Sequence, residues 1–220
     1  MRWDWIRTNF PRIWELTVDH LLLAIPTILA AFVLALPIGL VAHRYPSVRE
    51  IVVAASSLLY VIPSLALFII LPLILGTSML SPINVVVAMT LYGVALQVRS
   101  TADAFDTVPQ EVRQSAIAMG YATPRRIFSV DLPLAGPVIL AGLRVVAAST
   151  ISLISVGALI GVQSLGTLFT EGFQRNFPTQ IMAGLIGTVL LAIVVDAVLV
   201  GVGKLAMPWT RRGTARGRAI

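Results

Sequence analysis

The sequence lacks cysteine altogether, and charged residues are scarce, at 12% of 220 residues. The absence of cysteine excludes disulfide bonds, thiol catalysis and cysteine-based metal sites. In contrast, 57% of the residues are hydrophobic and the mean hydropathy is +0.91. A soluble domain of this size could not bury that much apolar surface, so the composition predicts a membrane protein.

The sequence also lacks the residue groupings of a metal site or an active site. Its two histidines, His20 and His43, flank the first apolar run, so we expect them at opposite membrane interfaces, where they cannot share a metal ion. There is no Ser-His-Asp grouping, no HExxH and no GxxxxGK[ST] sequence. We therefore predict no metal, no cofactor and no enzymatic activity.

The apolar residues fall into runs close to the roughly 20 residues that cross a bilayer as a helix. They predict an all-α integral membrane protein with one transmembrane domain over residues 21–203. Its spans are expected at about 21–42, 51–75, 83–98, 138–160 and 181–202. Residues 1–20 carry three of the four tryptophans and predict an extracytoplasmic interfacial segment. Residues 204–220 predict a basic tail with too few apolar residues to fold alone.

The placement of the arginines predicts the orientation. In a soluble protein the net charge of +6 could indicate nucleic acid as a partner, but in a membrane protein we interpret it as topology. If the polar segment 108–133 is cytoplasmic, then the loop 43–50 and the tail are cytoplasmic too, and that side gathers most of the arginines. The positive-inside rule then places the N-terminus outside and the C-terminus in the cytoplasm.

Segment 108–133 is predicted to form two short helices joined by a turn, which we call the elbow. Pro109 and Glu111 favour the start of a first helix, and Gly120 can stop it because glycine adopts the left-handed conformation cheaply. Thr123 and Pro124 favour a second helix, which we expect Pro133 to end. The elbow would lie at the membrane surface with a basic rim.

The elbow resembles the EAA loop of bacterial ABC importer permeases, whose pattern places E-A-A before a glycine and closes with I-x-L-P. Gln114-Ser115-Ala116 stands at E-A-A, Gly120 at the glycine, Val130 at the isoleucine, and Leu132-Pro133 at the end. Gln114 replaces the usual glutamate, and Ser115 replaces the first alanine. The change at Gln114 removes a charge that could meet a basic group on a partner. It suggests a tuned coupling loop, or pairing with a different permease subunit that keeps the glutamate.

The resemblance implies a five-span ABC type I importer permease core in the bacterial cytoplasmic (inner) membrane, with a coupling loop between spans three and four. A separate ABC ATPase subunit would bind the elbow, with Met119, Ile127 and Phe128 as apolar anchors and three arginines for steering and salt bridges. The predicted coupling residues are Arg113, Gln114, Ser115, Ala116, Met119, Gly120, Arg125, Arg126, Ile127, Phe128, Leu132 and Pro133.

Flanking segments resemble permeases for glycine betaine, carnitine and choline. They are IPSLALF at 62–68, the stretch from Leu91 to Thr101, LPLA at 132–135 with PVI at 137–139 and AGLR at 141–144, and LIGVQSLG at 159–166. They imply uptake of osmoprotectants, with an extracytoplasmic substrate-binding protein and a second permease subunit, identical or not, as partners. An ABC permease for another solute, such as an amino acid or methionine, remains an alternative. A stand-alone secondary transporter or channel would predict internal repeats and an intramembrane ion site, and we find no clear repeat.

Two charged residues lie inside predicted spans. Arg144 and Asp196 are at matched depth, about 10 Å from the cytoplasmic side at roughly 1.5 Å per residue, and have opposite sign. We interpret them as a structural ion pair, and a proton or ion relay is the alternative. A translocation path is predicted from Tyr60, Pro63, Ser64, Ser149, Ser152 and Ser155. Tyr60 could meet a quaternary ammonium by a cation–π contact, whereas all of these residues could instead be close-packing contacts between helices.

Overall fold

The computed structural model describes residues 2–212, which form helices and connecting turns without a strand. The basic tail predicted over 204–220 therefore falls partly outside the described residues. The elements are α1 (Trp3–Arg44), α2 (Pro46–Val61), α3 (Ser64–Leu75), α4 (Pro82–Asp106), α5 (Gln110–Ala118), α6 (Thr123–Arg126), the π-helix η1 (Ile127–Asp131), α7 (Leu132–Ile154), the 3₁₀-helix η2 (Ser155–Ile160), α8 (Gly166–Gln174), α9 (Pro178–Ala206) and the 3₁₀-helix η3 (Pro208–Arg212).

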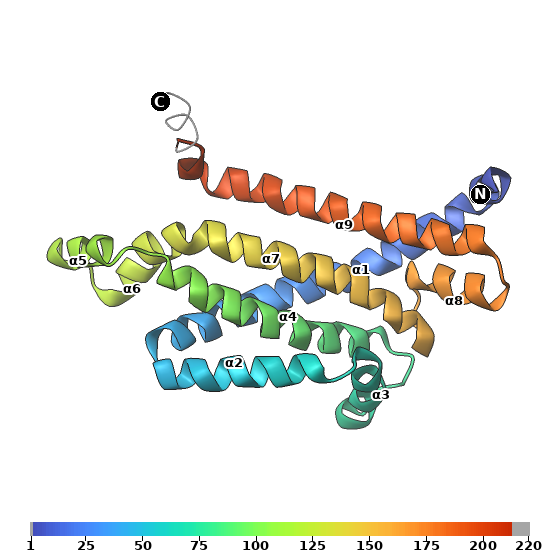
Figure 1. Cartoon of the computed structure of the whole chain (residues 1–220), viewed down its shortest axis with the longest axis horizontal. Helices are drawn as coiled ribbons and strands as arrows, with labels where there is room; N and C mark the ends of the chain where they lie inside the picture. Colours follow the sequence, from blue (N-terminus) through green and yellow to red (C-terminus); the bar gives the residue numbers. More distant parts are fainter. Residues whose placement is uncertain (1, 213–220) are drawn as a thin grey trace.

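The long helices run along one axis of an elongated bundle (Figure 1). Helix α4 packs against α1, α2 and α7, and α9 packs against α7 and α8. The elbow helices α5 and α6 lie at one end of the bundle with the end of α9, whereas α8 and the start of α1 lie at the other end (Figure 1). The elbow and the end of α9 therefore share one end of the molecule.

Helix α1 is longer than a bilayer is thick. Its 42 residues extend about 63 Å at 1.5 Å per residue, against a hydrocarbon core of about 30 Å. Residues 3–20, predicted to be interfacial, continue directly into the first span, and Leu16 and His20 in this part are buried in the bundle. The position of this segment at the membrane surface stays a prediction.

The second predicted span, 51–75, is broken and not a single continuous helix. Helices α2 and α3 meet at 102° around Ile62 and Pro63. Proline disfavours the helical conformation of the residue before it, and Ile62 is extended, with ψ of 125°. Taken as one bent span, α2 and α3 bring the candidate spans to five, so the prediction of an all-α chain with five spans is confirmed.

Pro133 was predicted to end the second elbow helix, and this prediction is wrong. The helical segment continues from Thr123 through Pro133 to Ile160. The wider π turn of η1 directly precedes the proline, and the Leu132 N–H donates to the Ile127 carbonyl. This shift relieves the clash between the proline ring and the preceding turn, so the elbow joins α7 without a break.

Small residues let the helices approach closely. A Cβ on Gly93 of α4 would lie 2.6 Å from the Cβ of Ala31 on α1, and a Cβ on Gly39 of α1 would lie 2.6 Å from that of Thr101. Such contacts are typical of helices packed within membranes. They hold α1 and α4 together along the half of the bundle that leads to the elbow.

Candidate functional site at the coupling elbow

The elbow turns sharply at Gly120. The Tyr121 N–H donates to the Ala116 carbonyl at 3.1 Å, and the Gly120 N–H donates to the Ile117 carbonyl at 2.9 Å. Gly120 has φ of +81°. Together these features form a Schellman motif, which requires a left-handed residue at this position. The turn sets the angle between α5 and α6.

The elbow presents apolar side chains to solvent. Met119 and Phe128 are each 70% exposed, and Ile117 is 55% exposed. Ile127, the third predicted anchor, is only partly exposed, and Ala116 of the EAA-like triplet is buried. Large apolar groups clustered on an exposed elbow are suited to docking against another protein.

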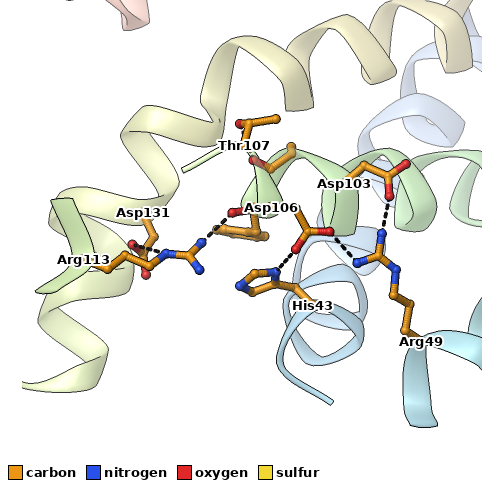
Figure 2. A network of polar contacts seen from close by, with 9 residues as sticks. His43, Arg49, Asp103, Asp106, Thr107, Arg113 and Asp131 are labelled. Atoms are coloured by element: carbon orange, nitrogen blue, oxygen red, sulfur yellow. Dashed lines mark hydrogen bonds and ion pairs between the residues drawn. The ribbon is translucent and has the colours of Figure 1, made fainter. Parts of the chain in front are cut away.

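Arg113 connects the elbow to the two helices beside it (Figure 2). Its Nη2 donates to the Phe105 carbonyl, in the last turn of α4, at 2.5 Å. Its Nε lies 3.4 Å from Oδ1 of Asp131, directly before α7. The Nε of Arg126 donates to the other Asp131 oxygen at 3.3 Å. Two arginines of the elbow thus share one carboxylate, which is only 4% exposed.

The remaining predicted coupling residues have different surroundings. Gln114 and Arg125 are exposed, and the Arg125 guanidinium lies 5.0 Å from the centre of the Tyr121 ring. The Ser115 hydroxyl donates to the Glu111 carbonyl within α5 at 2.8 Å. Leu132 and Pro133 are partly buried at the start of α7. Of the three predicted steering arginines, Arg125 is therefore the most exposed, because Arg113 and Arg126 bind within the chain.

A second polar network ties the α1–α2 corner to the end of α4 (Figure 2). The Nδ1 of His43 lies 2.6 Å from Oδ1 of Asp106, and the guanidinium of Arg49 pairs with both Asp106 and Asp103. The Arg49–Asp103 contact is 2.5 Å. Together with the Arg113–Phe105 contact, this network places the end of α4 between the elbow and the α1–α2 corner.

Sequence reasoning missed Asp131, Asp103 and Asp106. A signal for Asp131 was present, since it is the only carboxylate between Glu111 and Glu171 and follows a run of arginines. Asp103 and Asp106 are three residues apart, so they share a helix face at the polar end of α4. Among the described residues, no group of three or more His, Asp or Glu side chains is placed to hold a metal ion.

Arg144 and Asp196 are brought together by the packing of α7 against α9. Nε of Arg144 donates to Oδ1 of Asp196 at 2.5 Å, and Nη2 donates to Oδ2 at 2.8 Å. This two-pronged geometry is the strongest that a guanidinium and a carboxylate can adopt. The contact fits a structural ion pair within the spans, which remains our interpretation of these residues.

The predicted path residues lie on two parts of the bundle. Tyr60 is at the end of α2, edge to face with Tyr92 of α4 at 5.4 Å between ring centres, and the Tyr92 hydroxyl donates to the Ile62 carbonyl. Pro63 and Ser64 form the start of α3. The serines are on α7 and η2: Ser149 is partly buried, Ser152 is exposed, and Ser155 has a buried hydroxyl without a partner among the described residues. Helix η2, which begins at Ser155, packs against α3.

The family comparison covers nearly all of this architecture. Residues 28–212 match the model of the family "Binding-protein-dependent transport system inner membrane component". The chain belongs to this family. It is therefore a multi-pass inner-membrane permease that works with a substrate-binding protein and an ABC ATPase, and the importer class expected from the elbow is confirmed.

Relatives and solved structures agree with this assignment. The chain is 32% identical to the osmoprotectant import permease protein OsmW of Salmonella typhimurium, over 84% of this chain and 87% of that protein. It is 30% identical to the glycine betaine/carnitine/choline transport system permease protein OpuCD of Bacillus subtilis, over 82% and 78%. An inward-facing structure of the MetNI methionine ABC transporter has a chain with the same fold, with a TM-score of 0.75 at 19% identity over 89% of this chain and 97% of that one.

Proposed function

We propose that this permease takes up osmoprotectants of the glycine betaine, carnitine and choline class, driven by ATP hydrolysis on a separate subunit. The relatives named for these solutes are similar over most of their length, and the substrate proposal rests on them. The observation that carries the mechanism is the elbow. It combines exposed apolar side chains at its surface with buried arginine contacts at its base.

Coupling needs a part that binds the ATPase and a firm connection from that part to the spans. Met119 and Phe128 provide the binding surface, because burying large exposed apolar groups stabilises an interface. Arg113 provides the connection, since it contacts the end of α4 and Asp131, the residue directly before α7. A displacement of the elbow by the ATPase would thus move α4 and α7 together and reorient the bundle between inward-facing and outward-facing states.

The elbow is proposed to face the cytoplasm. The ends of α1, α4 and α9 lie near it, and this end carries Arg44, Arg49, Arg125, Arg126 and Lys204. A concentration of basic residues favours the cytoplasmic side. The N-terminus and α8 then lie outside, where the binding protein would deliver the solute.

A second permease subunit is proposed to complete the gate. Helix α2 has no buried residue in the chain, although it carries the exposed apolar side chains of Ile51, Leu58 and Val61. The face around the bend is therefore available for a partner subunit. The path would run between the two subunits, past Tyr60 and the serines of α7.

In-cell uptake tests the proposal. The chain would be expressed with its cognate ATPase and binding protein in bacteria that lack betaine uptake, at high external salt. We expect growth to recover when glycine betaine, choline or carnitine is supplied. Rescue by methionine or another amino acid alone would favour the alternative substrate class. Uptake by this chain without the ATPase would favour a secondary transporter or channel.

A further inference from the structure

We propose that a hollow between the end of α1 and the elbow binds the headgroup of an anionic phospholipid. The hollow has a volume of about 600 Å³ and is lined by side chains of α1, α6 and η1. Its polar wall includes Arg44, Thr123 and Arg126, and its apolar wall includes Leu40, Val41 and Ile127. The inference rests on the proposed orientation, which places this end of the bundle at the inner leaflet.

The hollow carries an excess of positive charge. The lining carboxylate, Asp131, is already shared between Arg113 and Arg126. Arg44 is exposed, and its guanidinium carbon lies 5.8 Å from the centre of the Tyr45 ring. Within residues 2–212 it pairs with no carboxylate. The guanidinium groups of Arg44 and Arg126 thus line one hollow. The single carboxylate in its lining, Asp131, already pairs with two arginines. Guanidinium groups bind phosphate oxygens strongly, through paired charge-assisted hydrogen bonds.

The mixed lining favours a lipid over a free phosphate ion. Leu40 and Val41 continue the apolar surface of α1 up to the hollow, and Val41 is itself exposed. Tyr45 is exposed at the same end, a position typical of tyrosine at the membrane interface. A lipid would place its phosphate against Arg44 and Arg126 and its acyl chains along α1. Basic pockets between helices on the cytoplasmic side are suited to such headgroups.

Because Ile127, Arg126 and Asp131 belong to the base of the elbow, a lipid here would contact the coupling segment directly. The occupied hollow would brace the elbow against the end of α1. The lipid composition of the inner leaflet would then influence how firmly ATPase movement is transmitted.

Retention of phosphatidylglycerol tests the site. The full-length chain would be reconstituted in phosphatidylcholine nanodiscs with and without phosphatidylglycerol. It would then be released from the nanodiscs under conditions that keep tightly bound lipids, and these lipids would be counted by native mass spectrometry. We expect the wild type to retain phosphatidylglycerol and Arg44→Ala to lower retention about fivefold, the effect of one basic side chain near a membrane surface. Arg125→Ala is the matched control, because Arg125 is exposed on the same elbow but does not line the hollow.

Arg44 forms no ion pair among the described residues, so its replacement should leave the fold intact, which the melting temperature checks. Arg126→Ala should lower retention in the same way. Equal losses in Arg44→Ala and Arg125→Ala would overturn the proposal in favour of diffuse surface charge. Complete displacement of phosphatidylglycerol by inorganic phosphate would overturn it in favour of a free anion site. The lipid experiment uses no ATPase, binding protein or solute. A loss of the lipid proposal would therefore not affect the transport proposal, and an importer that fails to transport would not affect the lipid result.

Discussion

Arg113 of the elbow bridges the Phe105 carbonyl of α4, at 2.5 Å, and the Asp131 carboxylate before α7, at 3.4 Å. These two contacts connect the elbow, the proposed docking segment for the ATPase, to the end of α4 and to the residue before α7. Phe105 and Asp131 both lie outside the EAA-like triplet, and the turn at Gly120 lies between Arg113 and Asp131 in the chain. In the proposed mechanism, this connection would transmit a displacement of the short exposed elbow to the larger bundle.

Arg113→Ala should uncouple ATP hydrolysis from transport. The variant removes both contacts and should lower the free energy of unfolding by about 1–3 kcal/mol, because the Phe105 carbonyl loses a charged donor and the buried Asp131 carboxylate loses one of its two positive neighbours. The measurement is the number of solute molecules delivered per phosphate released by the reconstituted importer. Arg113→Lys should give an intermediate ratio, since lysine keeps the charge but lacks the planar fork. An unchanged ratio in the alanine variant would show that this connection does not transmit motion.

Gly120 should tolerate asparagine better than alanine, and alanine better than proline. A Cβ at Gly120 meets no atom within 4 Å, so the cost of substitution is conformational and not steric. Alanine in the left-handed conformation costs about 1–2 kcal/mol, whereas asparagine adopts it more readily. Co-purification of the ATPase should be near normal in Gly120→Asn, weaker in Gly120→Ala and lost in Gly120→Pro. Full coupling in Gly120→Pro would contradict the docking role of the elbow.

Met119→Ala and Phe128→Ala should each weaken ATPase binding by about tenfold or more, the effect of removing an interface anchor. Both side chains are 70% exposed, so the melting temperature of the isolated chain should barely change. Phe173→Ala is the control, because Phe173 is 80% exposed but lies on α8 at the opposite end of the bundle. If Phe173→Ala weakened ATPase binding as much as Phe128→Ala, the elbow would not be the specific docking surface for the ATPase.

Asp196→Asn should destabilise the chain more than the double variant Arg144→Gln with Asp196→Asn. The single change leaves the Arg144 charge without its partner inside a span, whereas the double change removes both charges. Thermal stability of the purified protein measures the difference. If Asp196→Asn is as stable as the wild type but abolishes transport, the relay interpretation replaces the structural pair.

Tyr60→Leu should lower the apparent affinity for quaternary ammonium solutes, and Tyr60→Phe should preserve it. A cation–π contact needs the ring and not the hydroxyl. The edge-to-face packing of Tyr60 on Tyr92 fixes the ring, and phenylalanine keeps that packing. Concentration dependence of uptake distinguishes the two variants. Equal behaviour of Tyr60→Phe and Tyr60→Leu would assign Tyr60 to helix packing alone.

Much of the fold follows from local properties of the sequence. Apolar runs predict the spans, because a helix that crosses a bilayer needs about 20 apolar residues and must satisfy its backbone hydrogen bonds internally. The turn at Gly120 follows from the conformational freedom of one residue. Both are set within a few residues of the chain, which is why sequence reasoning can reach them.

The rest depends on contacts between distant segments. The effects of Pro63 and Pro133 were hard to predict from the sequence, because the two prolines act differently. At Pro63 the chain bends, with 102° between α2 and α3, whereas at Pro133 a preceding π turn lets the helix continue. The contacts of Asp131 and Asp106 depend on where α1, α4 and the elbow meet. No local pattern encodes these distances, so the polar networks at the base of the elbow emerge only from the packed structure.

ATP-dependent uptake of labelled glycine betaine into proteoliposomes, with this chain reconstituted beside its ATPase and binding protein, tests the central claim most directly. We predict saturable uptake that requires ATP, competes with choline and carnitine, and is lost in Gly120→Pro. A complex that assembles and hydrolyses ATP but moves none of these solutes would contradict the substrate assignment. Uptake that persists without any ATPase would contradict the coupling mechanism itself.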